Sequence, residues 1–335
     1  MSYSSGGLID QADYNALVGT TTSTTANQIN TIWAQGTGQY GWGQTAVANV
    51  ASTNLVTAAQ WTSMINTLDS IRKHQTGSAT GFTNPVVSGT LISWNSTLQS
   101  TINTAYSAQT SITKASTGTV TNQATQTLSC SAANGAGAQT FTATRTATFT
   151  SGDAARYFFN AGGSINFICG TATSSSSSAR SSDLLTMINS EFVSSGSFGA
   201  LTNSQRTGTG GTLAGGGYTS GYYSLTTGAQ TIAQITSTTS GYTGDYVSLT
   251  VATNTTNSSG HGDKGYILTY VLTVYSAART AIPAPPANPP GTGTTTTNTV
   301  VNDDINASIP HYLSVTYPET TNLSATAWGT PVTFG

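Results

Sequence analysis

The residues of this sequence that could do chemistry are few and lie far apart. Its three histidines, His74, His261 and His311, have no cysteine or carboxylate at the spacing of a metal site. The adjacent carboxylates Asp303 and Asp304 would point to opposite faces of an extended strand, so they do not form a catalytic pair. No G-x-S-x-G elbow is present, and no nucleophile has a recognisable partner. We therefore expect no enzyme activity, no metal and no cofactor.

Two glycine-rich spans, residues 36–41 and 260–265, match the phosphate-binding spacing G-x-G-x-x-G. This spacing cradles phosphate only where a strand leads into it and a helix begins from it, because the helix N-terminus then faces the anion. The first span follows a predicted helix, and the second leads into a predicted strand. A chain with 36 glycines contains such spans by chance, and we expect neither to bind phosphate.

Charge is scarce in this chain, which excludes several classes of partner. Only 6% of its 335 residues are charged, against about 25% in ordinary soluble domains. The basic residues are scattered, with Arg72 and Lys73 the only adjacent pair, so the chain lacks the basic surface that nucleic acid requires. Residues 1–7 do not resemble a secretory signal, and no apolar run approaches the length of a membrane span. We expect a protein made in a cytosol, without membrane insertion or bound nucleic acid.

Uncharged polar residues and aromatics take the place of charges. The chain is rich in Ser, Thr, Asn and Gln and has 15 tyrosines and 5 tryptophans. Threonine favours strands, and uncharged polar surface costs little to bury between subunits when it is hydrogen-bonded. We therefore expect a β-rich protein that assembles with copies of itself, as a closed trimer. For Cys130 and Cys169 a cytosol favours reduced, buried thiols, and a disulfide between them is the alternative.

The first 115 residues have a helical period and predict a helical attachment region. Thr57 suits the N-cap of a helix whose end carries Arg72 and Lys73. Its apolar stripe comprises Trp61, Met64, Ile65, Leu68 and Ile71. Before it, residues 12–33 predict one interrupted helix or two short ones, because threonines at 20–25 disfavour a helix interior. Another helix is predicted from about Ser88, with a stripe at Leu91, Trp94, Leu98, Ile102 and Tyr106.

From about residue 117 the period changes to two, which predicts strands. Apolar residues and Arg145 at odd positions from Phe141 to Phe149 alternate with threonines at even positions. Further strands are predicted at 246–251, 266–275 and 312–317. One helical island is predicted at 184–192, with Ser182 and Asp183 as its cap.

The fold class that follows is α+β, mainly β, with an N-terminal helical region followed by an antiparallel β-sandwich. The sandwich is predicted to occupy residues 116–281. A Pro/Thr-rich linker or arm follows at 282–300, where prolines exclude a central strand. C-terminal strands at 301–335 are predicted to complete the sandwich.

The densest aromatic cluster of the chain lies in ARYFFNAGGSINF, residues 155–167. Asn and Gly tolerate positive φ, so we interpret this segment as a β-hairpin with a turn after its aromatic strand. On one strand, Phe158 and Phe159 would point to opposite faces. The residues of this structural hairpin are Arg156, Tyr157, Phe158, Phe159, Asn160, Gly162 and Gly163.

This segment resembles one in the virion structural proteins of tailed phages, especially the marine, cyanobacterium-infecting phages with long contractile tails. ADYNALV (12–18) and TAAQWTSMINTLDSIRKHQTG (57–77), separated by a Gly-Tyr-Gly-rich loop, resemble the N-terminal region of the same proteins, and residues 302–335 resemble them more loosely. The resemblance implies a virion protein, a fibre or appendage subunit of the tail or neck. Its partners would be copies of itself and other virion proteins.

Aromatic residues in glycine- and serine-rich surroundings leave a second function open. Such side chains can anchor an interface or stack on a sugar. The candidates for contact with a partner or a host-surface glycan are Tyr40, Trp42, Tyr222, Tyr223 and Trp328. The alternative function is thus a glycan-binding adhesin module. A polysaccharide depolymerase is a third, for which no carboxylate pair can be placed.

Overall fold

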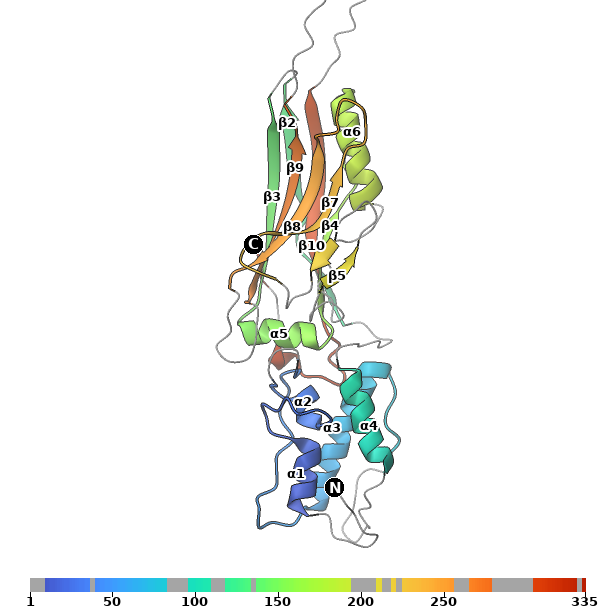
Figure 1. The fold of residues 1–335 in the computed structure, drawn as a ribbon, viewed down its shortest axis with the longest axis vertical. Helices are drawn as coiled ribbons and strands as arrows, with labels where there is room; N and C mark the ends of the chain where they lie inside the picture. The colour runs from blue at the N-terminus through green and yellow to red at the C-terminus, as the bar shows by residue number, and fades with distance from the viewer. Residues whose placement is uncertain are drawn as a thin grey trace, which may run out of the picture.

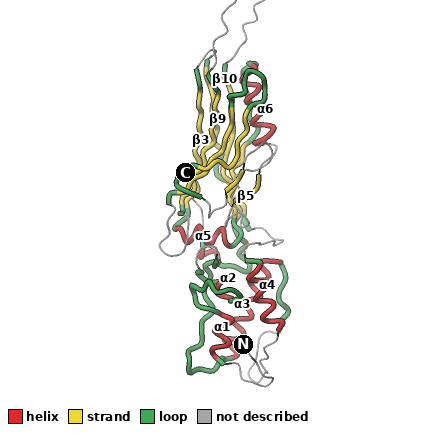
Figure 2. The backbone as a smooth tube through the Cα atoms, in the orientation of Figure 1, coloured by secondary structure: helices red, strands yellow, loops and turns green. Residues whose placement is uncertain are grey.

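A computed structural model describes residues 10–36, 40–82, 96–109, 118–133, 137–193, 209–212, 218–220, 225–255, 265–278, 304–329 and 333–335. Figure 1 shows an elongated molecule with four helices at one end and a β-sandwich at the other. A short helix, α5 (Gly152–Asn160), lies between the two ends, and the strands run along the long axis (Figure 2). The fold is therefore α+β and mainly β, as predicted.

The helical end contains α1 (Gln11–Val18), α2 (Ile29–Trp33), α3 (Ala58–Thr76) and α4 (Ser96–Ser107). Thr57 and Gln60 form a capping box at the start of α3, and Gly77 ends the helix in the left-handed conformation. The predicted stripe of α3 is buried, and residues 12–33 form two short helices. Of the helix predicted from Ser88, the part from Ser96 is confirmed, and Leu91 and Trp94 lie outside the described residues.

One sheet of the sandwich is built around β10 (Ile305–Thr316). Strands β1 (Val120–Asn122) and β2 (Gln126–Ala132) pair in succession with one edge of β10, and β4 (Ser164–Cys169) pairs with the other. All these pairings are antiparallel. Residues near the C-terminus therefore form the central strand of this sheet.

The second sheet has the strand order β11-β3-β9-β8-β7 and is also antiparallel. Its strands are β3 (Gln139–Thr148), β7 (Gln230–Thr236), β8 (Tyr246–Thr253), β9 (Ile267–Ser276) and β11 (Thr333–Phe334). Two further strands, β5 (Thr209–Thr212) and β6 (Tyr218–Ser220), pair with each other. The predicted alternation in β3 is confirmed, because Arg145 and Ala147 are buried while Thr142 and Thr144 are exposed.

The inner faces of the two sheets meet in one core. The rings of Phe167 on β4 and Tyr270 on β9 lie with centroids 6.4 Å apart. Arg145 of β3 reaches across the sandwich, where its Nη2 donates to the carbonyl oxygen of His311 on β10 at 3.0 Å. A buried guanidinium needs hydrogen-bond acceptors, so this contact fixes the two sheets relative to each other.

Helix α6 (Ala179–Met187) continues as the π-helix η1 (Ile188–Val193) and packs against the sandwich. Ser178 caps it, so the predicted cap at Ser182 and Asp183 was wrong by one turn. The helix begins earlier because Arg180 is buried, donating from Nε to Ser276 Oγ at 2.7 Å and from Nη2 to the Ala277 carbonyl.

The predicted hairpin at 155–167 was wrong. Residues Gly152–Asn160 form helix α5, and only the second half of the segment is a strand, β4. The hydroxyl of Ser151 caps the helix by accepting from the Ala154 amide, and Asp153 lies in its first turn. Because successive helical residues are about 100° apart, Phe158 and Phe159 enter the same core, and neither is exposed.

The two cysteines are free and buried. Cys130 pairs with Ala307 across one edge of β10, and Cys169 pairs with His311 across the other. Two strand spacings, about 9.5 Å, and an offset of four residues along β10 therefore separate their backbones, well beyond the roughly 7 Å that a disulfide allows. The reduced state follows from this geometry.

The aromatic cluster of α5 generates a stability prediction. Phe158 packs against Phe149, Phe159 and Tyr317 with ring centroids 5.0–5.7 Å apart. We expect Phe158→Ala to lower the free energy of unfolding by about 3–5 kcal/mol, because the buried ring leaves a cavity. Denaturant unfolding followed by circular dichroism measures this loss. The control Ser52→Ala, at an exposed position in a turn, should stay within about 0.5 kcal/mol of the parent protein.

Candidate functional site

The residues singled out for chemistry do not come together. His311 lies inside the sandwich with its ring stacked on Phe167, and His74 lies at the end of α3. Asp304 accepts a hydrogen bond from the hydroxyl of Ser176, while Asp303 and His261 lie outside the described residues. Within the described ranges, no group of three metal-ligating side chains is found.

Burial changes the acid–base properties of His311 without giving it a reactive partner. Burial and the nearby charge of Arg145 lower the pKa of the imidazole, and a hydrogen bond between Nδ1 and the Ile309 carbonyl opposes that shift. Arg145 also donates to the Ala124 carbonyl at 3.3 Å. These contacts describe a buried cation bound to backbone oxygens, which is a structural role.

Residues 37–39 of the first glycine-rich span lie outside the described residues, and the described residues around them lack the helix start that a phosphate cradle requires. Gly41 donates to the Thr31 carbonyl and Gly43 to the Ala34 carbonyl, so the loop folds back on α2. The chain that follows is irregular up to α3, so no helix begins from the loop to face an anion. The second span lies mostly outside the described residues.

The loop instead contacts helix α5. The buried Arg156 donates from Nη1 to the Tyr40 carbonyl at 2.7 Å, and its Nε and Nη2 hold Asp153 at 3.1 and 3.0 Å. Asn160 donates to the carbonyls of Tyr40 and Gly41 at 3.1 and 3.0 Å. Two side chains of one helix therefore satisfy the carbonyls of a loop more than a hundred residues away in the sequence.

Gly43 allows this close approach. Its φ is +69°, and a Cβ atom added there would lie 2.3 Å from the ring of Tyr157. Next to it, the side-chain amide of Gln44 bonds to Ser324 twice. Its Oε1 accepts from the Ser324 backbone N–H at 2.7 Å, and its Nε2 donates to the Ser324 carbonyl at 3.2 Å. The loop is thus held by α5 on one side and by the C-terminal segment on the other.

A buried ion pair lies beside this loop. His74 contacts Glu319 Oε1 through Nδ1 and the Ala161 carbonyl through Nε2, both at 2.9 Å. Both partners are acceptors, so the imidazole donates at both nitrogens and carries a positive charge. The rings of Trp42 and His74 pack edge to face, with their centroids 4.8 Å apart.

Glu319 is held as a carboxylate. Burial alone would raise its pKa, but hydrogen bonds from His74 and Asn322 lower the pKa to about 2. Its Oε2 also accepts from the Thr321 backbone at 2.6 Å. We call the set formed by residues 40–44, His74, α5 with Ala161, and residues 317–328 the junction, because it joins the helical end to the sandwich.

The prediction of partner or glycan contact was wrong for two of the aromatic residues. Trp42 and Trp328 are only 1% and 2% exposed, because the junction encloses Trp42 and the C-terminal segment buries Trp328. Tyr40 is half-buried, with its ring stacked on Tyr106 at 6.3 Å. Tyr222 and Tyr223 lie outside the described residues.

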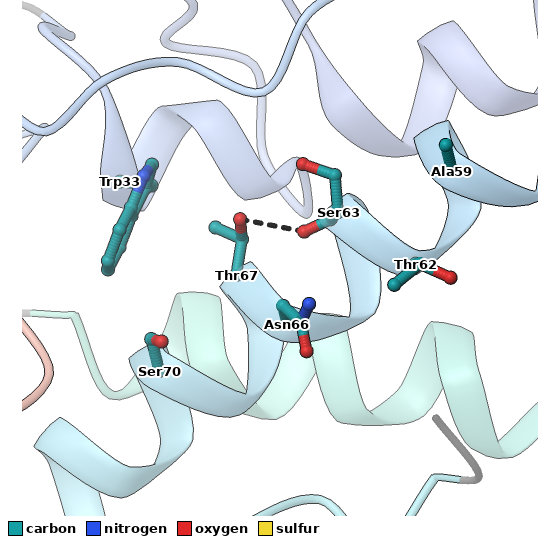
Figure 3. A pocket seen from close by; sticks show the side chains of 7 residues that line it. All are labelled: Trp33, Ala59, Thr62, Ser63, Asn66, Thr67 and Ser70. Carbon is teal, nitrogen blue, oxygen red and sulfur yellow. Dashed lines mark hydrogen bonds between the residues drawn. The ribbon is translucent and has the colours of Figure 1, made fainter. Parts of the chain in front are cut away.

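Trp33, which was not among the predicted contact residues, borders an open groove. The groove has a volume of about 390 Å³ and lies along the exposed side of α3, beside Trp33 of α2 (Figure 3). It is lined by Trp33, Ala59, Thr62, Ser63, Asn66, Thr67 and Ser70. Trp33 donates from Nε1 to the Thr45 carbonyl at 2.9 Å, which fixes the indole. No lining residue carries a charge.

Comparisons with models of protein families, with curated proteins and with solved structures found no significant match to this chain. Among the described helices, none is long and apolar enough to cross a membrane.

The ion pair of the junction generates a pH prediction. The pKa of Glu319 is about 2 in the folded chain and near 4.5 when unfolded, so its stabilising effect is complete above pH 4.5 and is lost as the pH falls toward 2. We expect a loss on the order of 2–3 kcal/mol over that interval. Urea unfolding at pH 6, 4.5, 3.5 and 2.5 measures it.

Two variants isolate the contribution of Glu319. Glu319→Gln should be less stable at pH 6 and should lose part of the acid dependence, because the amide does not titrate. Asp10→Asn replaces an exposed carboxylate by an equally good N-cap residue, so it should keep the dependence of the parent protein. An unchanged acid slope in Glu319→Gln would contradict the role of the ion pair.

Proposed function

We propose that this chain is a phage virion structural protein, a fibre or appendage subunit of the tail or neck. In this proposal the helical end docks on the particle and the sandwich projects from it. The elongated shape in Figure 1 is consistent with this role. The scarcity of charge favours surfaces that neighbouring subunits cover.

The observation that carries the proposal is that the segments resembling phage virion proteins contact one another in the junction. Arg156 and Asn160 belong to the aromatic segment, His74 to the second helical segment and Glu319 to the C-terminal segment. These four residues make hydrogen bonds within the junction. The segments that carry the resemblance thus meet where the helical end joins the sandwich, and a rigid connection of this kind supports the proposal of an appendage subunit.

Docking through the helical end can be tested at Leu55, which precedes α3. Its side chain is 76% exposed. The other end of α3 lies in the junction, so Leu55 is separated from the junction by the length of α3, about 28 Å. We expect Leu55→Asp to abolish incorporation into particles without changing the melting temperature. Mass spectrometry and cryo-EM of particles assembled with each variant measure incorporation.

The matched control is Val120→Asp on β1, which places the same charge at a 54% exposed apolar residue of the sandwich. This variant should incorporate normally. Equal incorporation of both variants would contradict docking through the helical end, and absence of the parent chain from purified particles would contradict the virion role.

The groove beside Trp33 favours a second candidate function, binding of a neutral saccharide. An indole supplies a flat apolar surface, while the hydroxyls and the Asn66 amide supply hydrogen-bonding groups. The uncharged lining disfavours acidic sugars.

Fluorescence of a Trp94→Phe variant can detect this binding, because Trp42, Trp61 and Trp328 are buried while Trp33 is partly exposed. Trp94 lies outside the described residues, so its replacement leaves Trp33 as the reporter. We expect a saturable change in tryptophan emission on titration with a neutral host-surface oligosaccharide. Asn66→Ala should weaken the binding at least tenfold. The control Thr76→Ala, an exposed position on α3 outside the groove, should bind as the parent protein does. A glycan array and a titration without saturable signal would exclude this function.

A further inference from the structure

Among the described residues, the outer edge of β3 has no partner strand over most of its length. In its sheet, β3 has β9 on one side, paired along all ten residues, and β11 on the other. β11 pairs only with Ala147 and Thr148. Next to this pairing, Gly335 exchanges two hydrogen bonds of 3.2 Å with Thr146. No strand in the described part of the chain pairs with residues 139–145 on this side.

The unpaired groups of this edge can be identified from Thr146. Its N–H and C=O point away from β9, toward Gly335. Backbone direction alternates along a strand, so the N–H and C=O groups of Thr140, Thr142 and Thr144 point the same way. Among the described residues, none of these groups has a backbone partner. Their side chains are exposed.

This edge lacks the features that normally prevent strand pairing. Proteins protect long edges with charged residues, proline or a bulge. Residues 139–144, QTFTAT, contain no charge and no proline, and the pairing of β3 with β9 has no break in register. Arg145, the nearest charge, is buried inside the sandwich. The edge is therefore open to another strand.

We propose that the edge of β3 pairs with the edge of β3 in a second copy, antiparallel and centred on Thr142. In this register Thr142 lies opposite Thr142 of the second copy, and Thr140 lies opposite Thr144. Each of these pairs exchanges two hydrogen bonds. Threonine pairs across strands are favourable, and an uncharged strand meets no repulsion from its own copy.

A second copy is favoured over a different partner because the edge is self-complementary and offers no charge to select another strand. The pairing is isologous and closes as a dimer, in contrast to the trimer predicted from composition. It does not depend on the virion proposal, because self-association is measured on the purified chain.

Cross-linking at the axis tests the register. The two Cα atoms of a hydrogen-bonded antiparallel pair lie about 5.5 Å apart, a separation that a disulfide can span. We expect Thr142→Cys to form a covalent dimer under mild oxidation at about 50 μM protein, while Thr273→Cys does not. Thr273 is paired with Thr142 on β9 and is a matched control one strand away from the edge. The native cysteines are buried and do not interfere.

Sedimentation tests the association itself. The parent chain should show a dimer whose fraction rises with concentration. Thr142→Lys should be monomeric and keep the far-UV circular dichroism spectrum of the parent chain, because its side chain is exposed. A dimer that persists in Thr142→Lys would overturn the proposal, and so would equal cross-linking of the two cysteine variants. A monomeric parent chain in which the Thr142 amide is protected from hydrogen exchange would also overturn it, and would indicate that the same chain covers the edge.

Discussion

The buried ion pair of His74 and Glu319 is the contact on which the connection between the two ends depends. It joins residues 245 positions apart, and its second hydrogen bond, to Ala161, fixes the end of α5 at the same point. A charge removed from water is stable only when its hydrogen bonds are satisfied, so each partner holds the other in place. Loss of one member would leave an unpaired buried charge, which costs more than the pair contributes.

The same principle holds elsewhere in the molecule. Three arginines, Arg145, Arg156 and Arg180, are at most 1% exposed, and each donates to backbone carbonyls of a distant segment. A chain with very few charges thus places several of them in its interior. Arg145 connects the two sheets, Arg156 connects the loop to α5, and Arg180 connects α6 to the sandwich. Deleting residues 1–80 would remove His74 and the loop, so Glu319 would lose its ion pair and Arg156 and Asn160 would lose the carbonyls of Tyr40 and Gly41. The sandwich is therefore expected to be less stable without the helical end.

Local patterns in the sequence predicted most of the elements, and non-local contacts explain where prediction failed. The stripe and cap of α3 and the alternation of β3 follow from periods of 3.6 and 2, which depend only on neighbouring residues. The segment at 155–167 was misinterpreted because aromatic residues favour strands, although Ser151 offered a helix cap three residues before Ala154. Trp42 was expected at the surface because its loop is rich in glycine. Gly43 instead lets the loop approach Tyr157 closely, a contact that no local pattern reveals.

The pairing proposed at β3 constrains how the molecule would act as an appendage. The strands run along the long axis in Figure 1, so an antiparallel pair of β3 strands places the two molecules side by side with their long axes in opposite directions. Their helical ends then face in opposite directions, and both cannot dock on one flat surface. If both inferences hold, the dimer is a bridge with one docking end at each extremity, and the sandwiches form its rigid centre. A subunit of this kind would connect two parts of a particle, and a free projecting tip would require the monomer.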